Sequence, residues 1–387
     1  MHRIQLLLLL IILLPGLLLP NSIGLASSGL PGSVEFGYGA RLDLNGNNPD
    51  GAIQIAHSFG LDWVAIDFNW QQQWPELNGQ PDTSTLFRLT NIASQRGLNV
   101  LLSVSNPPPW VMNQFGPDAD TTAWLVETLV SAFPETILAV ELFPGANTRK
   151  AWGQTPDPHG YLLVLQAVDR RLRLRGFPAV IIPGLETGIG SPEGDMEDIG
   201  FLRALYSAGA PPVFPIVGLR FLELTGMPAQ EPSANDVHLL RRYELVRSVM
   251  VSSGHDSDMI WITGMTWPKE VQSAQDQSVW IGQAYSLLKR QPFIGAAFFT
   301  WLNIPGQNNS QASPFSLVGE DLRPSSAAEA IYQVSSNTFP YTENLTNSDS
   351  KVNDSITAEL QSTDGQNYNA THFVKIYIGK SWLRKGG

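Results

Sequence analysis

Short apolar runs alternate with longer amphipathic segments from about residue 33 onward. Eight of these runs have the near-continuous hydrophobicity of parallel strands that are covered on both faces; they lie at residues 34–39, 63–68, 99–105, 137–143, 178–185, 214–220, 259–264 and 294–301. Helical periodicity lies between them, most clearly at residues 121–133, 160–175, 237–253 and 271–290. Asp120 and Asp157 stand near two of these helix starts, where an aspartate can cap the first turn.

Eight strand-like runs separated by helices, over about 300 residues, match the usual size of a (β/α)₈ barrel. The rival architecture, a doubly wound open sheet, often carries a glycine-rich phosphate loop after its first strand, and 36-FGYGARLDLNG-46 is not such a loop. We therefore predict an α/β fold, a (β/α)₈ TIM barrel over residues 33–338.

The C-terminal residues 339–387 differ in kind from the barrel segment. They are rich in Asn, Ser and Thr and end in the alternating run 372-HFVKIYIG-379. So short a segment cannot bury much of a core by itself. We predict a linker followed by a short β-type tail, and a disordered tail fits the composition equally well.

The N-terminus has the pattern of a secretory signal. Residues 6–19 are almost wholly apolar after Arg3, and the small residues 24-GLA-26 follow. A run of this length with those flanks is typical of a signal peptide and is too short for an ordinary membrane span. We predict that residues 1–26 form a signal peptide and that the protein is secreted or extracytoplasmic. An uncleaved N-terminal anchor, which would attach the protein to the cell surface, is the alternative.

The composition excludes several classes of function. The formal net charge of −11 argues against a nucleic-acid-binding surface, and the absence of cysteine excludes disulfides and thiolate catalysis. The six histidines show no metal-ligand spacing, and neither a G-x-S-x-G elbow nor a Walker loop is present. We therefore expect neither a metal nor another cofactor.

Several blocks resemble clan A glycoside hydrolases, the cellulase- and β-xylosidase-like TIM-barrel enzymes. The stretch 141-ELFPGAN-147 resembles their E-I-W-N-E-P-N segment, and 261-WITGMTW-267 resembles W-x-T-E-F-G-W. Further along, 296-AAFFTWLN-303 and 315-FSLVGEDLRPSSAAEAI-331 are similar to the last strand and the closing loop and helix of that family. The blocks occur in the family's order, which implies a site at the carboxyl ends of the strands.

The resemblance also places the two catalytic carboxylates, and this chain lacks both. Retaining glycosidases need two carboxyl groups about 5–5.5 Å apart. The acid/base position corresponds to Gly145 and the nucleophile position to Gly264. Glu141 does not rescue the pair, because it lies four residues upstream, roughly 13 Å back along a strand. The sequence therefore predicts a catalytically degenerate site.

Three other acids keep an active enzyme open as an alternative. Asp67, Glu186 and Glu223 fall on or after predicted strands, and an inverting mechanism tolerates carboxyl groups about 6.5–9.5 Å apart. In the plainer interpretation, Asp67 is a hydrogen-bonded interior residue and the other two are solvated loop acids.

Aromatic side chains gather at the predicted strand ends, where flat indole rings can stack on sugar faces. The predicted glycan contacts are Trp70, Trp110, Phe143, Asn147, Trp267 and Trp301. Packing of these rings against one another is the competing interpretation. The sequence thus predicts a secreted pseudo-glycosidase that binds an oligo- or polysaccharide. The alternatives are an active hydrolase with relocated carboxylates, and a non-catalytic cell-surface structural or interaction protein with a filled barrel mouth.

Overall fold

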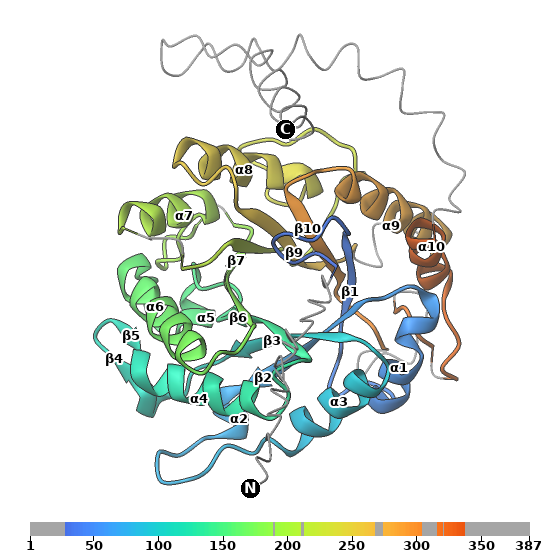
Figure 1. The fold of residues 1–387 in the computed structure, drawn as a ribbon. Helices are drawn as coiled ribbons and strands as arrows, with labels where there is room; N and C mark the ends of the chain where they lie inside the picture. The colour runs from blue at the N-terminus through green and yellow to red at the C-terminus, as the bar shows by residue number, and fades with distance from the viewer. Residues whose placement is uncertain are drawn as a thin grey trace, which may run out of the picture. The chain divides into compact units, whose positions relative to one another are not determined.

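Eight parallel strands close into a barrel in the computed structural model, which describes residues 28–188, 190–209, 213–267, 274–303, 316–319 and 321–336 (Figure 1). Around the barrel the order is β1 (Gly37–Arg41), β10 (Ile294–Phe299), β9 (Met259–Met265), β8 (Ile216–Arg220), β7 (Val180–Glu186), β6 (Ile137–Leu142), β3 (Asn99–Ser105) and β2 (Trp63–Asn69). The predicted (β/α)₈ fold is confirmed.

Helices surround the strands on the outside of the ring (Figure 1). They are α1 (Pro49–Ala56), α3 (Ser84–Gln95), α4 (Ala119–Ser131), α6 (Pro158–Leu174), α7 (Asp198–Ser207), α8 (Tyr243–Ser252), α9 (Ala274–Lys289) and α10 (Ser326–Ser335). The loops after strands add the short helices α2 (Trp70–Gln73) and α5 (Arg149–Trp152), the turns η1 (His57–Phe59), η2 (Pro109–Val111) and η3 (Leu240–Arg242), and a hairpin of β4 (Met112–Asn113) and β5 (Gly116–Pro117). Within the described part of the chain, no helix is long and apolar enough to cross a membrane.

Two helix starts test the predicted caps. Asp157 caps α6, because its side chain accepts a hydrogen bond from the His159 amide. The prediction for α4 is wrong by two residues: Asp118 accepts from the Thr121 amide, and Asp120 lies inside the first turn. An acidic side chain in the first turn still interacts favourably with the positive end of the helix dipole.

Chain contacts divide the protein into two units, Met1–Tyr332 and Gln333–Gly387. The barrel belongs to the first unit, and of the second unit only residues 333–336 are described. The predicted signal segment, residues 1–26, and the predicted tail, residues 339–387, lie outside the described residues. These assignments and the predicted limits of the barrel stay predictions.

An apolar floor fills the barrel near the amino ends of its strands. Trp63 and Trp261 pack edge to face at 4.9 Å between ring centroids, and Phe298 lies against both. Gly39 has no room for a side chain, since a Cβ atom there would lie 2.3 Å from the Phe298 ring. The indole nitrogens of Trp63 and Trp261 donate to the carbonyls of Ser28 and Gly29 at 2.8 and 3.1 Å. The chain at residues 28–29 therefore closes the barrel from below.

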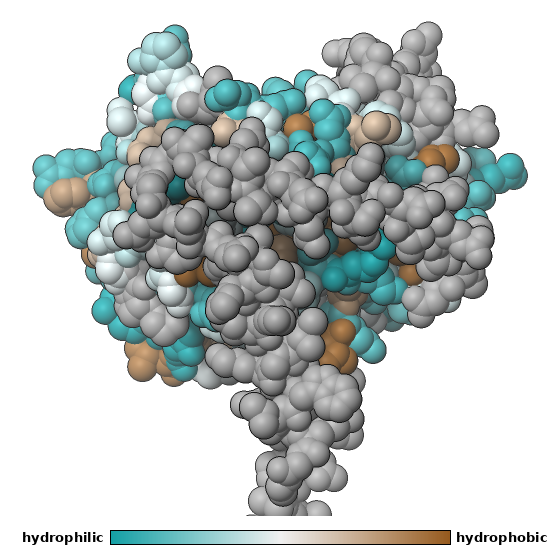
Figure 2. All heavy atoms as spheres, turned by 90° about the horizontal axis from the view of Figure 1, so that it is seen from above, coloured by the Kyte–Doolittle hydropathy of each residue, from teal (hydrophilic) through white to brown (hydrophobic). Residues whose placement is uncertain are grey.

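The exposed apolar residues are scattered. On the face shown in Figure 2, small brown patches are separated by teal ones over the described residues that are visible there. Single exposed apolar side chains are normal on soluble proteins. The described residues visible on this face therefore show no large continuous apolar patch.

Candidate functional site

A charged network occupies the barrel interior above the apolar floor. Asp67, Ser103 and Glu141 are register neighbours on β2, β3 and β6, so their side chains share one layer. Arg41 enters this layer from β1: it donates to Asp67, to Ser103 Oγ at 2.9 Å and to Glu141 Oε2 at 3.3 Å. It also donates to the Thr263 carbonyl at 3.0 Å, and Ser103 donates to Glu141 Oε2 at 2.7 Å.

The carboxyl groups of Asp67 and Glu141 stabilise the charged form of Arg41. Burial disfavours the charged Arg41 guanidinium, but Asp67 and Glu141 outweigh it and raise the pKa of Arg41 above its ordinary value. Glu141 is fully buried, and its second oxygen, Oε1, has no partner among the described residues. The side chain of Asp67 is 40% exposed and is tied to Arg41. Among the three alternative acids, Asp67 is therefore hydrogen-bonded inside the barrel, as the non-catalytic interpretation of this residue expects.

The loop after β6 leaves little room for a side chain at Gly145. Its φ is +84°, a left-handed conformation that glycine adopts easily and other residues adopt at a cost. A Cβ atom built there would lie 3.2 Å from both Cβ and Oε2 of Glu186 and 3.5 Å from Cβ of Ala151. The amides of Gly145 and Ala146 both donate to the Gly184 carbonyl at 3.1 Å, which fixes the turn against β7.

Arg220 covers the corresponding space at Gly264. The two residues are register partners on β8 and β9. A Cβ atom at position 264 would lie 3.1 Å from Cγ and 3.6 Å from Nε of Arg220. The side chain of Arg220 therefore lies across the position at which the resemblance puts a nucleophilic carboxylate.

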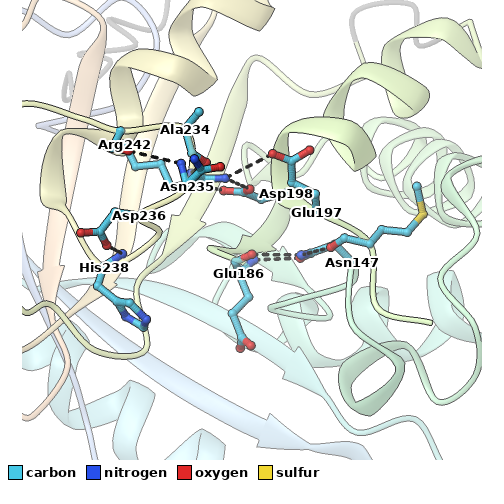
Figure 3. Close-up of polar contacts among 11 residues, drawn as sticks. Asn147, Glu186, Glu197, Asp198, Ala234, Asn235, Asp236, His238 and Arg242 are labelled. Carbon is cyan, nitrogen blue, oxygen red and sulfur yellow. Dashed lines mark hydrogen bonds and ion pairs between the residues drawn. The ribbon is translucent and has the colours of Figure 1, made fainter. Parts of the chain in front are cut away.

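Glu186 and Arg220 are themselves register partners, on β7 and β8. Figure 3 shows the Glu186 side chain pointing away from its backbone contacts, with no dashed line at its carboxyl end. Neither the Glu186 carboxyl nor the Arg220 guanidinium makes a hydrogen bond or an ion pair with any other described residue. The strand ends thus present one acid and one cation, side by side and without direct partners.

Burial moves both groups away from their charged forms. It raises the pKa of Glu186, and the nearby Asp195 adds to this, while Arg220 and Lys150 pull the pKa down. Burial also lowers the pKa of Arg220, and the like charge of Arg41 acts in the same direction against the surrounding carboxylates.

Asn147 has a structural role, which corrects the predicted sugar contact. Its side chain is fully buried and its amide donates to the carbonyls of Glu186 and Met196 at 3.0 and 3.1 Å (Figure 3). Its oxygen accepts from the Glu186 amide at 2.9 Å. Because backbone groups use the amide in this way, Asn147 holds the end of β7 and thereby positions Glu186.

For three of the aromatic residues, the predicted glycan contact is also corrected. Trp70, Phe143 and Trp267 are at most 1% exposed, so their faces are closed to a ligand. Other rings cover them: Trp74 stacks on Trp70, Trp152 meets Phe143 edge-on, and Trp280 meets Trp267 edge-on. Only Trp110 and Trp301 remain partly exposed, and for these two the predicted sugar contact stays a prediction.

Glu223, the third alternative acid, is exposed in the loop after β8, as expected for a solvated loop acid. A cavity of about 400 Å³ opens among the loops that follow β2, β3 and β6. Lys150 is the one charged residue among those lining it, which are Gln71, Asn106, Pro107, Pro109, Met112, Lys150 and Gly153. In the described part of the chain, no group of three or more His, Cys, Asp or Glu could hold a metal ion.

We predict that Glu186→Gln stabilises the protein at neutral pH. The pKa of Glu186 is raised on folding, so the folded state holds its proton more tightly than the unfolded state does. Native stability should therefore fall as pH rises from the ordinary carboxyl value of 4.5 through the raised one. The free energy of unfolding, measured across this pH range, should not show that decline in Glu186→Gln. An unchanged pH profile would show that Glu186 titrates normally.

Comparison with known proteins bears on the fold. No family model matches the chain, and no curated protein matches it. Among solved structures, it is similar to a family 39 glycoside hydrolase from Bacteroides cellulosilyticus WH2 (TM-score 0.58, 15% identity, 77% of this chain and 63% of that one). It is similar to the exo-beta-1,4-mannosidase Op5Man5 from Opitutaceae bacterium strain TAV5 (0.57, 14%, 78% and 59%).

A third similar structure is a GH5_18 from Bifidobacterium longum subsp. infantis (0.58, 13%, 78% and 79%). The chain spans about three fifths of the length of the first two proteins. At these identities the likeness concerns the fold. The structural neighbours of this chain are clan A glycoside hydrolases, and it shares their eight-stranded parallel barrel.

Proposed function

We propose that this protein is a secreted, glycoside-hydrolase-like protein that binds an oligo- or polysaccharide at the barrel mouth without hydrolysing it. One observation carries the proposal: at Gly145 and Gly264, where the sequence resemblance puts the two catalytic carboxylates, the side chains of Glu186 and Arg220 lie against the space that a new side chain would need. The family's reaction needs an acid/base and a second carboxylate at a defined separation.

The remaining acids of the mouth are poorly suited to replace that pair. Asp67 and Glu141 are bound to Arg41, so using either as a base or nucleophile would take an ion-pair partner from a buried arginine. Glu186 is the acid that is left, and one carboxyl group does not complete the mechanism.

Glycan binding is supported by the chemistry of the mouth. The cavity of about 400 Å³ offers the polar side chains of Gln71, Asn106 and Lys150 beside apolar walls. Sites of this size with a few convergent polar groups are typical of small-ligand binding. Among the structural neighbours, a GH5_18 from Streptomyces cattleya is in complex with GlcNAc. The signal-like residues 1–26 support an extracytoplasmic location, where such a glycan would be met.

We predict no hydrolysis of aryl glycosides or of β-glucan, xylan and mannan by the purified protein, measured as reducing ends against a buffer blank. Binding to a glycan array should nevertheless be detectable, and it should weaken in Trp110→Ala, a change at a partly exposed ring. Leu163→Ala, on the outer face of α6, serves as the control for the loss of an exposed apolar side chain. Turnover well above the blank would contradict the proposal, and silence on both assays would leave only a structural role.

An active hydrolase is the second candidate, favoured by Glu186 alone. Burial raises the pKa of this carboxyl, as a general acid requires, and its Oε2 lies 3.2 Å from the Cβ position at Gly145. If the native protein turns over any substrate, Glu186→Gln should reduce the rate by about 10²–10⁴-fold. Turnover that survives this change would exclude Glu186 as the acid.

A further inference from the structure

We infer that the barrel mouth selects glycans that carry an anionic group, a carboxylate or a sulfate, and that Arg220 and Lys150 recognise it. This inference rests on the proposed glycan-binding function and specifies its ligand class. It starts from Arg220, a cation at the end of β8 that makes no direct contact with an acid of the described chain.

An unpaired guanidinium in this position is costly. Arg220 is mostly buried at the strand ends, and burying a charge without a partner is unfavourable. The positive charge of Arg41 in the layer below adds repulsion. An incoming carboxylate or sulfate would relieve both effects, because the planar guanidinium can donate two parallel hydrogen bonds to such a group.

The neighbouring acids do not form an ion pair with Arg220. Asp67 and Glu141 are already committed to Arg41, and Ser103 holds the same Glu141 oxygen. Glu186 is the register partner of Arg220, yet no ion pair joins the two side chains within 4.0 Å. Asn147 fixes the backbone of Glu186 from both sides, which restrains its approach to Arg220.

A second cation faces the same region from another element. Lys150, on α5, lines the cavity of about 400 Å³ and acts electrostatically on Glu186, as Arg220 does. Glu186 is therefore under the influence of two cations, neither of which has an ion-pair partner among the described residues. A chain of negatively charged sugars that runs across the strand ends could contact both cations, whereas neutral sugars would leave both charges unpaired.

Protonation of Glu186 should accompany anion binding, since a charged carboxylate beside the ligand would repel it. The charged groups that act on Glu186 are Arg220 on β8, Lys150 on α5 and Asp195 before α7. Binding of an anionic glycan should then strengthen as pH falls through the raised pKa of Glu186, while binding of a neutral glycan should not.

The test measures dissociation constants of the full chain for size-matched oligosaccharides by calorimetry: oligogalacturonate, a sulfated oligosaccharide, and neutral cello- and manno-oligosaccharides. We expect the anionic ligands to bind at least about tenfold more tightly than the neutral ones, with the preference weakening at high salt. Comparison of the first two ligands tells whether the recognised group is a carboxylate or a sulfate.

Arg220→Gln should abolish the preference by weakening the binding of anionic glycans far more than that of neutral ones, while Arg220→Lys should retain part of the preference, because the charge stays but the bidentate geometry is lost. Lys150→Gln should reduce the preference too. Arg88→Gln, which removes the same charge from an exposed pair with Asp50, is the control. Thermal melts establish that each variant folds, and Glu186→Gln should remove the pH dependence.

The outcomes separate the two proposals. Equal binding of neutral and anionic glycans, with Arg220→Gln affecting both alike, would overturn the anion selectivity and keep the glycan-binding function. Binding of none of these glycans by a folded native protein would overturn both.

Discussion

Arg41→Met is expected to destabilise the protein by about 3–5 kcal/mol, the cost of leaving a buried charge without its partner. The substitution removes the cation that neutralises Glu141, a side chain with no exposed surface. Ser103 would remain its hydrogen-bond donor, and Glu141 Oε1 already lacks a partner among the described residues. Chemical denaturation with an unchanged m-value would measure the loss.

The reverse change should cost less. In Glu141→Met, Arg41 keeps Asp67 and the Thr263 carbonyl, so no ion is left unpaired. The double variant Arg41→Met, Glu141→Met should also be more stable than Arg41→Met alone, because apolar groups of similar volume can replace a buried ion pair. Arg88→Met, at an exposed pair, should change the free energy of unfolding by less than about 1 kcal/mol. A loss no greater in Arg41→Met than in Glu141→Met would show that Glu141 is not ionised in the folded protein.

Restoring two glutamates should fail to restore hydrolysis. In Gly145→Glu, Gly264→Glu, the new side chain at position 145 meets Glu186 and must adopt a left-handed backbone. The new side chain at position 264 meets Arg220, and an ion pair between them would keep a carboxylate from acting as nucleophile. We expect this double variant to be silent on aryl glycosides and less stable by about 1–3 kcal/mol, the usual cost of such crowding and strain.

Removing the two obstructing side chains is the decisive comparison. Adding Glu186→Ala and Arg220→Ala to the two glutamates should yield the first variant with measurable turnover, exceeding the double variant by at least about 10²-fold, the contribution of a working acid/base. The pair Glu186→Ala, Arg220→Ala without new glutamates controls for opening the mouth. Activity already present in the double variant would show that the space at both glycines is freer than the contacts indicate.

The architecture could be predicted because its strands are covered on both faces. The run at residues 99–105 coincides with β3, since every position after Asn99 is apolar or a serine. The first strand was predicted at residues 34–39, whereas β1 runs from Gly37 to Arg41. Hydrophobicity misses such a residue, because a charged side chain inside a barrel resembles the start of a loop until its partners are known.

The site was harder to predict than the fold because its properties depend on distances between loops. The resemblance and the strand-end positions drew attention to Gly145, Gly264 and Glu186, and their functional role stays a prediction. It could not show that Trp70 and Trp267 are covered by other rings, since indoles in packing and in binding give the same sequence pattern. Arg220 passed unnoticed as a site residue, although a lone arginine closing an apolar run was a usable signal.

The two indole hydrogen bonds that hold residues 28–29 against the floor of the barrel also define which end of the barrel this segment lies at. Residues 28–29 lie at the amino ends of the strands. Arg220, Glu186 and the cavity all lie toward the carboxyl ends. A tether joined to residues 28–29 would therefore hold the barrel by its base. Arg220 and Lys150 would then face outward, toward whatever passes in solution, and not toward the surface that carries the tether.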